Sequence, residues 1–285
     1  MNKELARELI SAGVHFGHAV SRWNPKMAPY IFGKRGMIHI INVKETLKGL
    51  VISKKLLSTI VSNGLDVVFV GTKRQAKKGV QNAAEKCGMH YVSERWLGGT
   101  LTNFRTIRSR LQRLEELEDM DNTGKIESQG KKQGSRLKRE LRKVKTNLDG
   151  IRKMSRIPGA MVVVDAKKEH IALREARKMG IPTIAIGDTD ADPDAVDVII
   201  PANDDSIKAI EILLDQLAAA VAEGKTMVRR EDFTAAPARP VRTRSRRVLA
   251  SASDEEQSEE PIAAEPVQEE TADTETSQPA ESSAQ

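Results

Sequence analysis

Short, mostly apolar runs alternate with longer amphipathic segments along much of this 285-residue chain, and this alternation restricts the fold more than any other feature. Four of the runs are predicted strands, at 66–70, 160–164, 182–186 and 196–200. Strands that are apolar throughout are buried on both faces, and strands separated by helices pair in parallel through right-handed crossovers. The pattern therefore predicts an α/β fold with a parallel sheet.

The segments between these strands have the apolar periodicity of helices. Helices are expected at about 3–12, 43–61, 71–87, 166–179 and 204–222, with a further strand at 37–41. Asn42 is placed to cap the second of these helices, and Thr72 to cap the third. Residues 14–36 mix aromatic residues and histidines with prolines and glycines, and this composition predicts a long loop.

One stretch interrupts the α/β pattern. After two glycines at 98–99, apolar residues recur at spacings of three and four from Phe104 to Leu114, and again from Leu137 to Ile151. Two narrow apolar stripes joined by a polar segment are typical of an antiparallel coiled-coil hairpin, because an ordinary surface helix needs a broader apolar face. We therefore predict a hairpin insertion at 102–156. The α/β globular domain would consist of residues 1–101 and 157–225.

Charge is distributed unevenly along the chain. Residues 251–285 contain eleven acidic and no basic residues, so the net charge of +6 for the whole chain becomes +17 for residues 1–250. The basic arm at 226–250 and the acidic tail at 251–285 have no apolar periodicity, and both are expected to be disordered. A basic folded part attracts polyanions such as nucleic acid, although the charge could also serve solubility alone.

Composition also argues against several classes of protein. The single cysteine, Cys87, excludes an intramolecular disulfide framework and a multi-cysteine zinc site. The first residues resemble no signal peptide, and no window approaches eighteen apolar residues. We therefore expect a cytoplasmic protein without a membrane partner.

The signals for catalysis are weak. Although parallel α/β sheets often bind nucleotides, the segment GTKRQAK at 71–77 lacks the glycine spacing of both dinucleotide-binding loops and P-loops. Lys73 and Arg74 could hold one isolated phosphate at a helix start, or could simply be solvated. No serine or cysteine has the sequence context of a catalytic nucleophile. We predict no catalytic residue and no cofactor.

Acidic residues gather after two of the predicted strands. They are Asp188, Asp190, Asp192, Asp194, Asp204 and Asp205. Together with the imidazole of His18, such carboxylates could hold a divalent ion. Capping of loops and helices is the alternative role of these aspartates and requires no metal. The prediction is that no metal is bound.

The strongest functional signal is the basic character of the predicted hairpin. Residues 103–156 contain sixteen Lys or Arg and eight Asp or Glu. Cations bind phosphates, and exposed aromatic rings such as those expected at Tyr30 and Phe32 stack on unpaired bases, a combination that RNA-binding proteins use. The predicted RNA-binding residues are Trp23, Lys26, Lys73, Arg74, Arg95, Trp96, Asn103, Phe104, Arg105, Arg108, Arg110, Arg113, Lys138, Arg139, Arg142 and Lys145.

Five segments of the chain, taken in order, resemble the bacterial small-ribosomal-subunit protein two family. They are AGVHFGH at 12–18, WNPKM at 23–27, FVGTKR at 69–74, RWLGG with LTN at 95–103, and NDD at 203–205. The resemblance implies a flavodoxin-like, doubly wound domain with an inserted coiled-coil hairpin, located on the back of the small subunit between head and body. It also implies contacts with small-subunit ribosomal RNA and with other ribosomal proteins, including the OB-repeat ribosomal protein one that captures messenger RNA.

These observations predict a structural, RNA-binding constituent of the small ribosomal subunit that supports translation initiation without catalysis. Two alternatives remain at this point. One is a nucleotide-dependent RNA-modifying enzyme with an RNA-binding hairpin, which would bind ATP, GTP or NAD. The other is a free coiled-coil adaptor, which would not sediment with ribosomal subunits.

Overall fold

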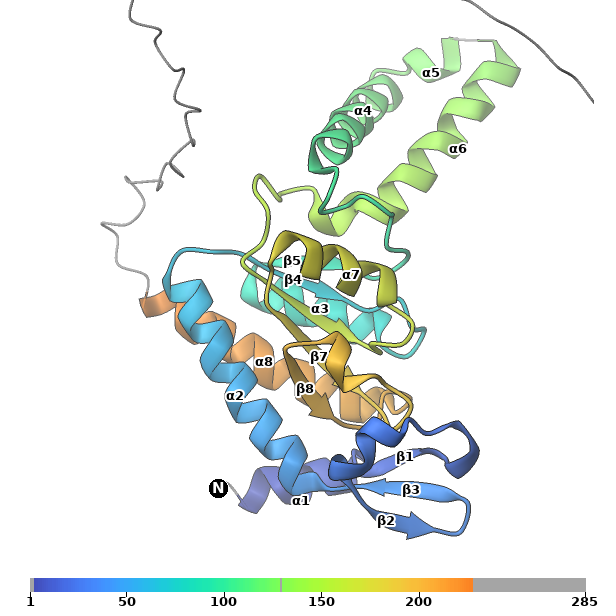
Figure 1. Cartoon of the computed structure of the whole chain (residues 1–285). Coiled ribbons are helices and arrows are strands. Elements are labelled where there is room, and N and C mark those ends of the chain that lie inside the picture. The colour runs from blue at the N-terminus through green and yellow to red at the C-terminus, as the bar shows by residue number, and fades with distance from the viewer. Residues whose placement is uncertain (1–2, 129, 228–285) are drawn as a thin grey trace, which may run out of the picture. The chain divides into compact units, whose positions relative to one another are not determined.

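The computed structural model describes residues 3–128 and 130–227, and its centre is a parallel sheet (Figure 1). The strands are β4 (Val67–Val70), β5 (His90–Val92), β6 (Ala160–Val164), β7 (Thr183–Gly187) and β8 (Val198–Pro201). They lie in the order β5-β4-β6-β7-β8, and every neighbouring pair is parallel. Numbered along the chain, this order is 2-1-3-4-5, which is consistent with a flavodoxin-like fold. The predicted α/β class with a parallel sheet is confirmed.

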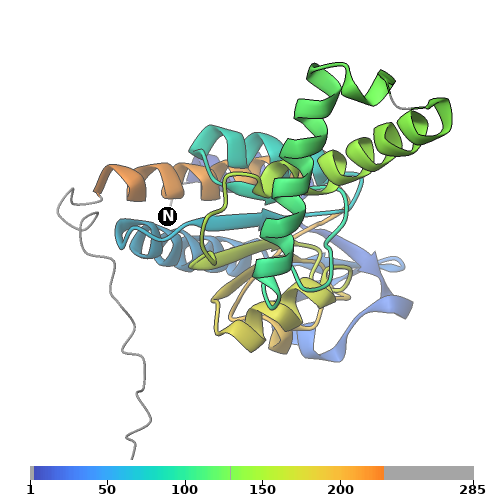
Figure 2. The same ribbon diagram turned by 90° about the horizontal axis from the view of Figure 1, so that it is seen from above.

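Helices cover both faces of the sheet. The main helices of the α/β domain are α2 (Val43–Ser62), α3 (Lys77–Cys87), α7 (His170–Met179) and α8 (Ile207–Met227). In Figure 2, α3 and α8 lie on one side of the sheet and α7 on the other. Alternate strand residues enter two separate cores: Phe69 and Val162 pack with α2, α3 and α8, whereas Val68 and Val163 pack with α7. This alternation follows from the two-residue period of a strand.

Both edges of the parallel sheet are covered by other parts of the chain. At β5, the short helix η3 (Asp149–Ile151) approaches so closely that a Cβ atom on Gly150 would lie 2.2 Å from the carbonyl oxygen of Tyr91. At β8, the hydroxyl of Thr46 on α2 donates to the carbonyl of Pro201 at 2.6 Å. Strand β5 is absent from the sequence-based prediction because three residues are too few for an apolar run.

A second, antiparallel sheet precedes the main one. Helix α1 (Lys3–Ser11) leads into β1 (Phe16–Ala19), β2 (Ile31–Arg35) and β3 (Ile38–Ile41), with β3 in the middle. The predicted loop at 14–36 is therefore wrong, since it contains two strands and the 3₁₀ helices η1 (Val20–Arg22) and η2 (Pro25–Tyr30). Both strand pairings have irregular register, and this disrupts the alternation that would indicate strands.

The helices between β5 and β6 are α4 (Phe104–Asn122), α5 (Lys125–Ser128) and α6 (Lys131–Leu148). Helices α4 and α6 contact each other, and α5 contacts both (Figure 1). Leu114, Leu117 and Ile126 are fully buried within this group of helices. At its base, Ile107 and Leu148 join the core beneath α7. The helices inserted here thus share a core with the sheet.

Several predicted boundaries change in the structure. Helix α3 begins at Lys77 and not at 71, because the amide and hydroxyl of Thr72 donate to Glu169 at 3.0 and 2.5 Å instead of capping a helix. Helix α7 begins at His170 and not at 166. The predicted cap at Asn42 is confirmed, since its side chain accepts a hydrogen bond from the amide of Lys44 at 3.1 Å.

The basic arm and the acidic tail lie almost entirely outside the described residues. Helix α8 extends to Met227, two residues into the predicted arm. Among the described helices, none combines the length and the apolar character that a membrane span requires.

A single carboxylate holds the loop that leads into α4. Glu175, on α7, is 9% exposed and accepts hydrogen bonds from the indole of Trp96 at 3.2 Å and from the amide of Gly99 at 2.7 Å. Its other oxygen accepts from the amides of Leu101 and Thr102 at 3.0 and 3.3 Å. Burial alone would raise the pKa of Glu175, but these donors outweigh burial and lower the pKa.

We expect Glu175→Gln to lower the free energy of unfolding by about 2–3 kcal/mol, because the amide keeps one acceptor oxygen but loses the charge that strengthens each bond. Urea unfolding at pH 7 measures this change. The exposed Glu223→Gln is the control and should stay within about 0.5 kcal/mol of wild type. Because the folded pKa is lowered, the advantage of wild type should be complete above pH 4.5 and disappear as the pH falls below it. Equal stabilities at pH 7 would contradict this role of Glu175.

The indole of Trp96 is 6% exposed and packs in the core beneath α7. Trp96→Ala should therefore cost about 3–5 kcal/mol by leaving a cavity and removing one donor to Glu175. Phe32→Ala, which truncates a ring that is 78% exposed, is the control and should leave the melting temperature nearly unchanged. Thermal melts of both variants measure the difference. If both variants melt at the temperature of wild type, Trp96 does not stabilise this loop.

Candidate functional site

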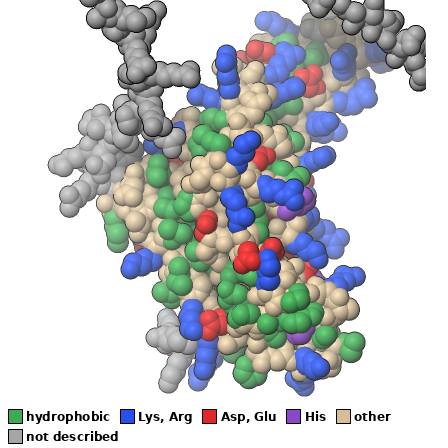
Figure 3. Space-filling view, viewed as in Figure 1, with side chains coloured by type: hydrophobic (Ala, Val, Ile, Leu, Met, Phe, Trp, Pro, Cys, Tyr) green, Lys and Arg blue, Asp and Glu red, His purple; other side chains and the backbone are tan. Residues whose placement is uncertain are grey.

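The predicted RNA-binding cations of the inserted helices form two sets. Arg105, Arg108, Arg110, Arg139 and Arg142 are exposed and form no ion pair with any acid in the described ranges. In contrast, three others are paired: Arg113 with Glu116 at 2.8 Å, Lys138 with Glu127 at 2.9 Å and Lys145 with Glu118 at 3.1 Å. Figure 3 shows Lys and Arg side chains over these helices and along one edge of the molecule, with few acidic side chains among them. The unpaired set has its full charge available for phosphates.

The aromatic residues at the base of α4 do not form a stacking surface. Trp96 is buried and bonded to Glu175, so its ring is not available for stacking on a base. Phe104 is half-buried and packs against the core beneath α7. Asn103 and Arg95 are exposed. Only the polar and charged members of this group are therefore free to contact a nucleic acid.

The predicted RNA-binding residues nearest the amino terminus, Trp23 and Lys26, lie beside the antiparallel sheet. Trp23 is half-buried, and its ring lies 5.1 Å from that of His39 at an interplanar angle of 41°. The ammonium of Lys26 contacts the carboxylates of Asp192 and Asp194 at 3.1 and 2.6 Å. Phe32 is exposed as predicted, whereas Tyr30 is half-buried. Trp23 and Lys26 thus have partners within the chain.

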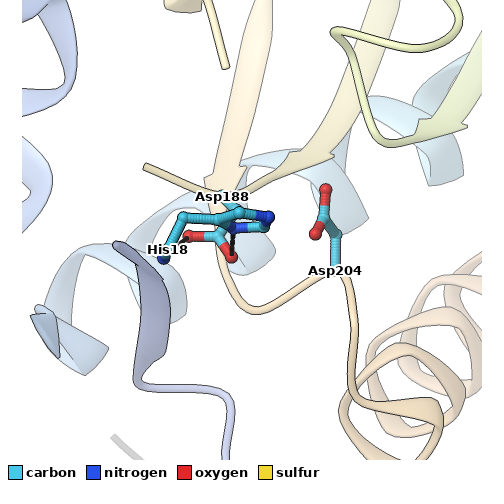
Figure 4. A group of neighbouring side chains, drawn as sticks. All are labelled: His18, Asp188 and Asp204. Atoms are coloured by element: carbon cyan, nitrogen blue, oxygen red, sulfur yellow. Dashed lines mark hydrogen bonds and ion pairs between the residues drawn. The ribbon is translucent and has the colours of Figure 1, made fainter. Parts of the chain in front are cut away.

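A cluster of charged residues gathers at the carboxyl ends of β6, β7 and β8 (Figure 4). His18, on β1, donates through Nδ1 to the carboxylate of Asp188 at 2.6 Å, while its Nε2 lies 3.5 Å from Asp205. The ammonium of Lys73 lies 2.8 Å from Asp204 and 2.6 Å from Asp205. The structure thus brings together His18, Asp188 and Asp204, which are far apart in the sequence. Lys73 belongs to this cluster, and its contact with a phosphate stays a prediction.

The backbone of β1 makes the approach of His18 possible. A Cβ atom on Gly17 would lie 2.7 Å from the methyl carbon of Thr189, so only glycine fits there without a shift. The amide of His18 then donates to Asp188 at 3.2 Å and to the hydroxyl of Thr189 at 3.1 Å. The antiparallel sheet is attached to the parallel sheet through these bonds.

Burial and pairing change the ionisation of this cluster. The hydrogen bond with Asp188 outweighs burial and raises the pKa of His18 to about 9. Burial raises the pKa of Asp204 to about 7 in spite of the nearby ammonium of Lys73. Burial would lower the pKa of Lys73, but its bonds to Asp204 and Asp205 raise it overall. At neutral pH the cluster therefore contains two cations of the chain itself among its carboxylates.

Three ligand atoms of His18, Asp188 and Asp204 lie within 4.8 Å of one another, a spacing that a divalent ion could bridge. The ammonium of Lys73 and the protonated imidazole of His18 already neutralise part of the carboxylate charge. The ion-pair network explains the arrangement without a metal. That no metal binds here stays a prediction.

The strand order places the usual ligand crevice of such folds between β4 and β6, where the order reverses. The buried carboxylate of Glu169 lies there and accepts both hydrogen bonds from Thr72. A phosphate group in this crevice would replace those bonds and meet the negative charges of Glu169 and Asp165. Arg74 is exposed outside the crevice. The geometry therefore disfavours a bound nucleotide.

Basic residues just before α7 and along it form a row that was not predicted. Lys167, His170, Arg174 and Arg177 recur at spacings of three and four, a helical signal that was available in the sequence. With Lys26 and three aspartates they line a groove of about 520 Å³. Lys167 pairs with Asp190 at 3.1 Å, so the charges of this groove are largely balanced.

The stability of the protein should depend on the protonation of His18. Because the folded pKa of about 9 exceeds the ordinary value of 6.5, the contribution of His18 is complete below pH 6.5 and is lost as the pH rises through 9. Urea unfolding should show His18→Gln less stable than wild type by on the order of 2–3 kcal/mol at pH 6, with a smaller difference at pH 9.5. The exposed His170→Gln should match wild type at both values. A constant deficit for His18→Gln would rule out the ion pair as its cause.

Comparison with known proteins identifies the family. The family described as ribosomal protein S2 matches residues 9–224. A small ribosomal subunit protein uS2 from Rhodopirellula baltica is 53% identical over 240 residues, which cover 84% of this chain and 92% of that protein. A small ribosomal subunit protein uS2 from Endomicrobium trichonymphae is 47% identical over 226 residues, which cover 79% of this chain and 93% of that protein. This chain therefore belongs to the ribosomal protein S2 family.

Proposed function

We propose that this protein is a structural constituent of the small ribosomal subunit, where it binds ribosomal RNA and neighbouring ribosomal proteins. Membership of the ribosomal protein S2 family carries this proposal. The family is structural and not enzymatic, and its members are components of the cytoplasmic small subunit. The net charge of +17 for residues 1–250 suits a protein that is surrounded by phosphates.

The inserted helices support the proposed contact with RNA. Five arginines of α4 and α6 are exposed and unpaired with described acids, whereas the strand-end cluster uses its cations internally. The RNA-binding surface that we propose therefore consists of the unpaired cations on these helices, together with the exposed side chains of Arg74, Arg95 and Asn103. Lys26, Lys73, Trp23, Trp96 and Phe104 are better explained by contacts within the chain.

Two finer structural points belong to the same proposal. Helices α4 and α6 pack as a two-stranded antiparallel coiled coil, which the apolar stripes at 104–114 and 137–151 and the contact between the helices support. Residues 1–101 and 157–225 form the globular domain into which 102–156 are inserted. The core that Ile107 and Leu148 share with the sheet supports a fixed direction for this insertion.

The partner proteins that we propose include the OB-repeat ribosomal protein one, through which the chain would support translation initiation. The family resemblance supports this partner. The exposed apolar residues Phe16, Phe32, Met37 and Ile38 near the antiparallel sheet offer a surface on which another protein could bury area. No membrane partner is proposed.

A sucrose-gradient experiment tests the proposed function and the role of the unpaired arginines. Tagged wild-type chain should sediment with small subunits, and washing with increasing salt should release it steeply. A variant with Arg105, Arg108, Arg110, Arg139 and Arg142 changed to Gln should be released at lower salt. Its log affinity for ribosomal RNA should fall with log salt at a slope shallower by about 3.5–4.5 than that of wild type.

The control variant removes the same charge from ion-paired sites. Lys48, Lys86, Arg113, Lys138 and Lys145 each contact an acid, so changing them to Gln should alter the salt dependence less. Wild-type chain that stays at the top of the gradient would refute the proposed function. Equal slopes for the two variants would refute only the role of the unpaired arginines.

A further inference from the structure

Helix α7 forms one wall of a groove on the α/β domain, on the side of the sheet away from α3 and α8 (Figure 2). The loop between β7 and β8, which carries Asp190, Asp192 and Asp194, forms the opposite wall. The groove has a volume of about 520 Å³. Ligand pockets of proteins are typically of this size, at roughly 300–1,000 Å³. We call this cavity the α7 groove.

The α7 groove has an apolar floor beneath charged walls. Ala166 and Leu173 line it, and both are almost fully buried, so they lie at the bottom of the groove. A binding site commonly combines apolar surface, which supplies contact area, with a few charged groups that fix the orientation of the ligand. The composition of the α7 groove therefore suits a ligand that has an apolar part and a charged part.

Three of the four Lys and Arg residues that line the groove are bonded within the chain. Lys167 contacts Asp190, and Lys26 contacts Asp192, both at 3.1 Å. The ammonium of Lys26 also lies 2.6 Å from the third aspartate of the loop. The guanidinium of Arg177 donates to a backbone carbonyl of the same loop. The acidic wall is thus already supplied with cations by the protein.

Arg174 differs from these three residues. It is exposed on α7, and its side chain forms no hydrogen bond or ion pair within residues 3–128 and 130–227. His170, one turn earlier on the same helix, also has no side-chain partner in these ranges. A guanidinium presents its N–H donors in a planar fork that fits both oxygens of a carboxylate. The groove therefore offers a carboxylate-binding group beside an apolar floor.

We propose that the α7 groove binds a short segment of a neighbouring small-subunit protein, through an apolar side chain and an adjacent carboxylate. The carboxylate pairs with Arg174, and the apolar side chain lies over Leu173. This inference rests on the proposed function, which places other ribosomal proteins beside the chain. It adds the surface on which one of them binds and the chemistry by which that segment is recognised.

The charge of the groove favours a protein segment over RNA. Four Lys or Arg residues and three aspartates line it, so its formal charge is +1 when His170 is counted as neutral. An RNA strand has a phosphate at every nucleotide, and the phosphates beyond the first would lie near the aspartates. A peptide can present one carboxylate among uncharged residues. Of the described residues that line the groove, none is Phe, Tyr or Trp, on which an unpaired base could stack.

The first test places an amine at the proposed contact. Small subunits assembled with the full-length Arg174→Lys variant are treated with a carbodiimide, which activates a carboxylate so that a touching amine forms an amide bond with it. Mass spectrometry should find a link between position 174 and an Asp or Glu of another small-subunit protein, next to an apolar residue. Lys178, an exposed amine on the same helix outside the groove, is the internal control and should form few such links.

A second experiment detects a partner of either class. The photoreactive amino acid benzoylphenylalanine replaces Ile171, which is 47% exposed and lies three residues before Arg174 on α7. Residues at this spacing are neighbours on a helix surface. Illumination of the assembled small subunits should join position 171 to the same protein segment. Digestion of the product with nuclease or with protease shows whether the partner is RNA or protein.

A third experiment measures the contact in isolation. The linked segment, made as a fluorescent peptide, should bind the full-length wild-type chain, and Arg174→Gln should weaken this binding about tenfold by removing a charged hydrogen-bonded pair. Lys178→Gln removes the same charge from the same helix and should leave the affinity nearly unchanged. Arg174→Lys should fall between wild type and Arg174→Gln, because an ammonium keeps the charge but not the planar fork.

Three outcomes would overturn the inference: no link from position 174 to another protein, photochemical links to RNA alone, or equal peptide affinities of wild type and Arg174→Gln. Each of them leaves the proposed function intact if the wild-type chain sediments with small subunits. Failure of that sedimentation refutes the proposed function instead. The two claims are thus tested separately.

Discussion

The buried carboxylate of Glu175 determines where the inserted helices leave the α/β domain. A loop that departs from the end of a strand exposes backbone amides for which no neighbouring strand supplies acceptors, and burying such amides unpaired is costly. Glu175 accepts from three of them and from the indole of Trp96. Burying the charge of Glu175 would cost much free energy if these donors did not surround it. The direction of α4, and with it the placement of the charges on α6, therefore depends on an interaction inside the globular domain.

The ends of the parallel strands are stabilised in the same way. Glu169 accepts from Thr72, and Asp188 binds His18, so side chains of the protein fill the region where related sheets receive phosphate-containing ligands. The strand order is that of related sheets, but the crevice is filled by side chains of the protein. Charges that could meet a polyanion lie instead on helices inserted after β5. Fold and function are separable in this sense, because the surface that contacts a partner can be appended to an unchanged sheet.

The helices and strands that could be predicted from the sequence are those whose apolar residues recur at a regular spacing. Phe69 and Val162 lie in apolar runs, and the stripe from Phe104 to Leu114 repeats at helical spacing, so both were predictable. Pairings between distant residues were not. Trp96 is aromatic and near a basic segment, but its partner Glu175 is 79 positions away, and no local pattern shows that its ring is buried. Lys73 likewise meets Asp204 across 131 positions, and no local pattern shows that its ammonium forms part of an ion-pair network.

The coverage of both sheet edges has a consequence for the protein before it meets RNA. An open edge strand presents unpaired amides and carbonyls that can pair with another copy and begin aggregation. Here η3 lies against β5, with Gly150 close to Tyr91, and α2 lies against β8, where Thr46 bonds to Pro201. Neither edge offers a free ladder to a second chain. The two edges of the parallel sheet are therefore closed to strand exchange, and the exposed arginines of α4 and α6 provide the charged surface that can contact a polyanion.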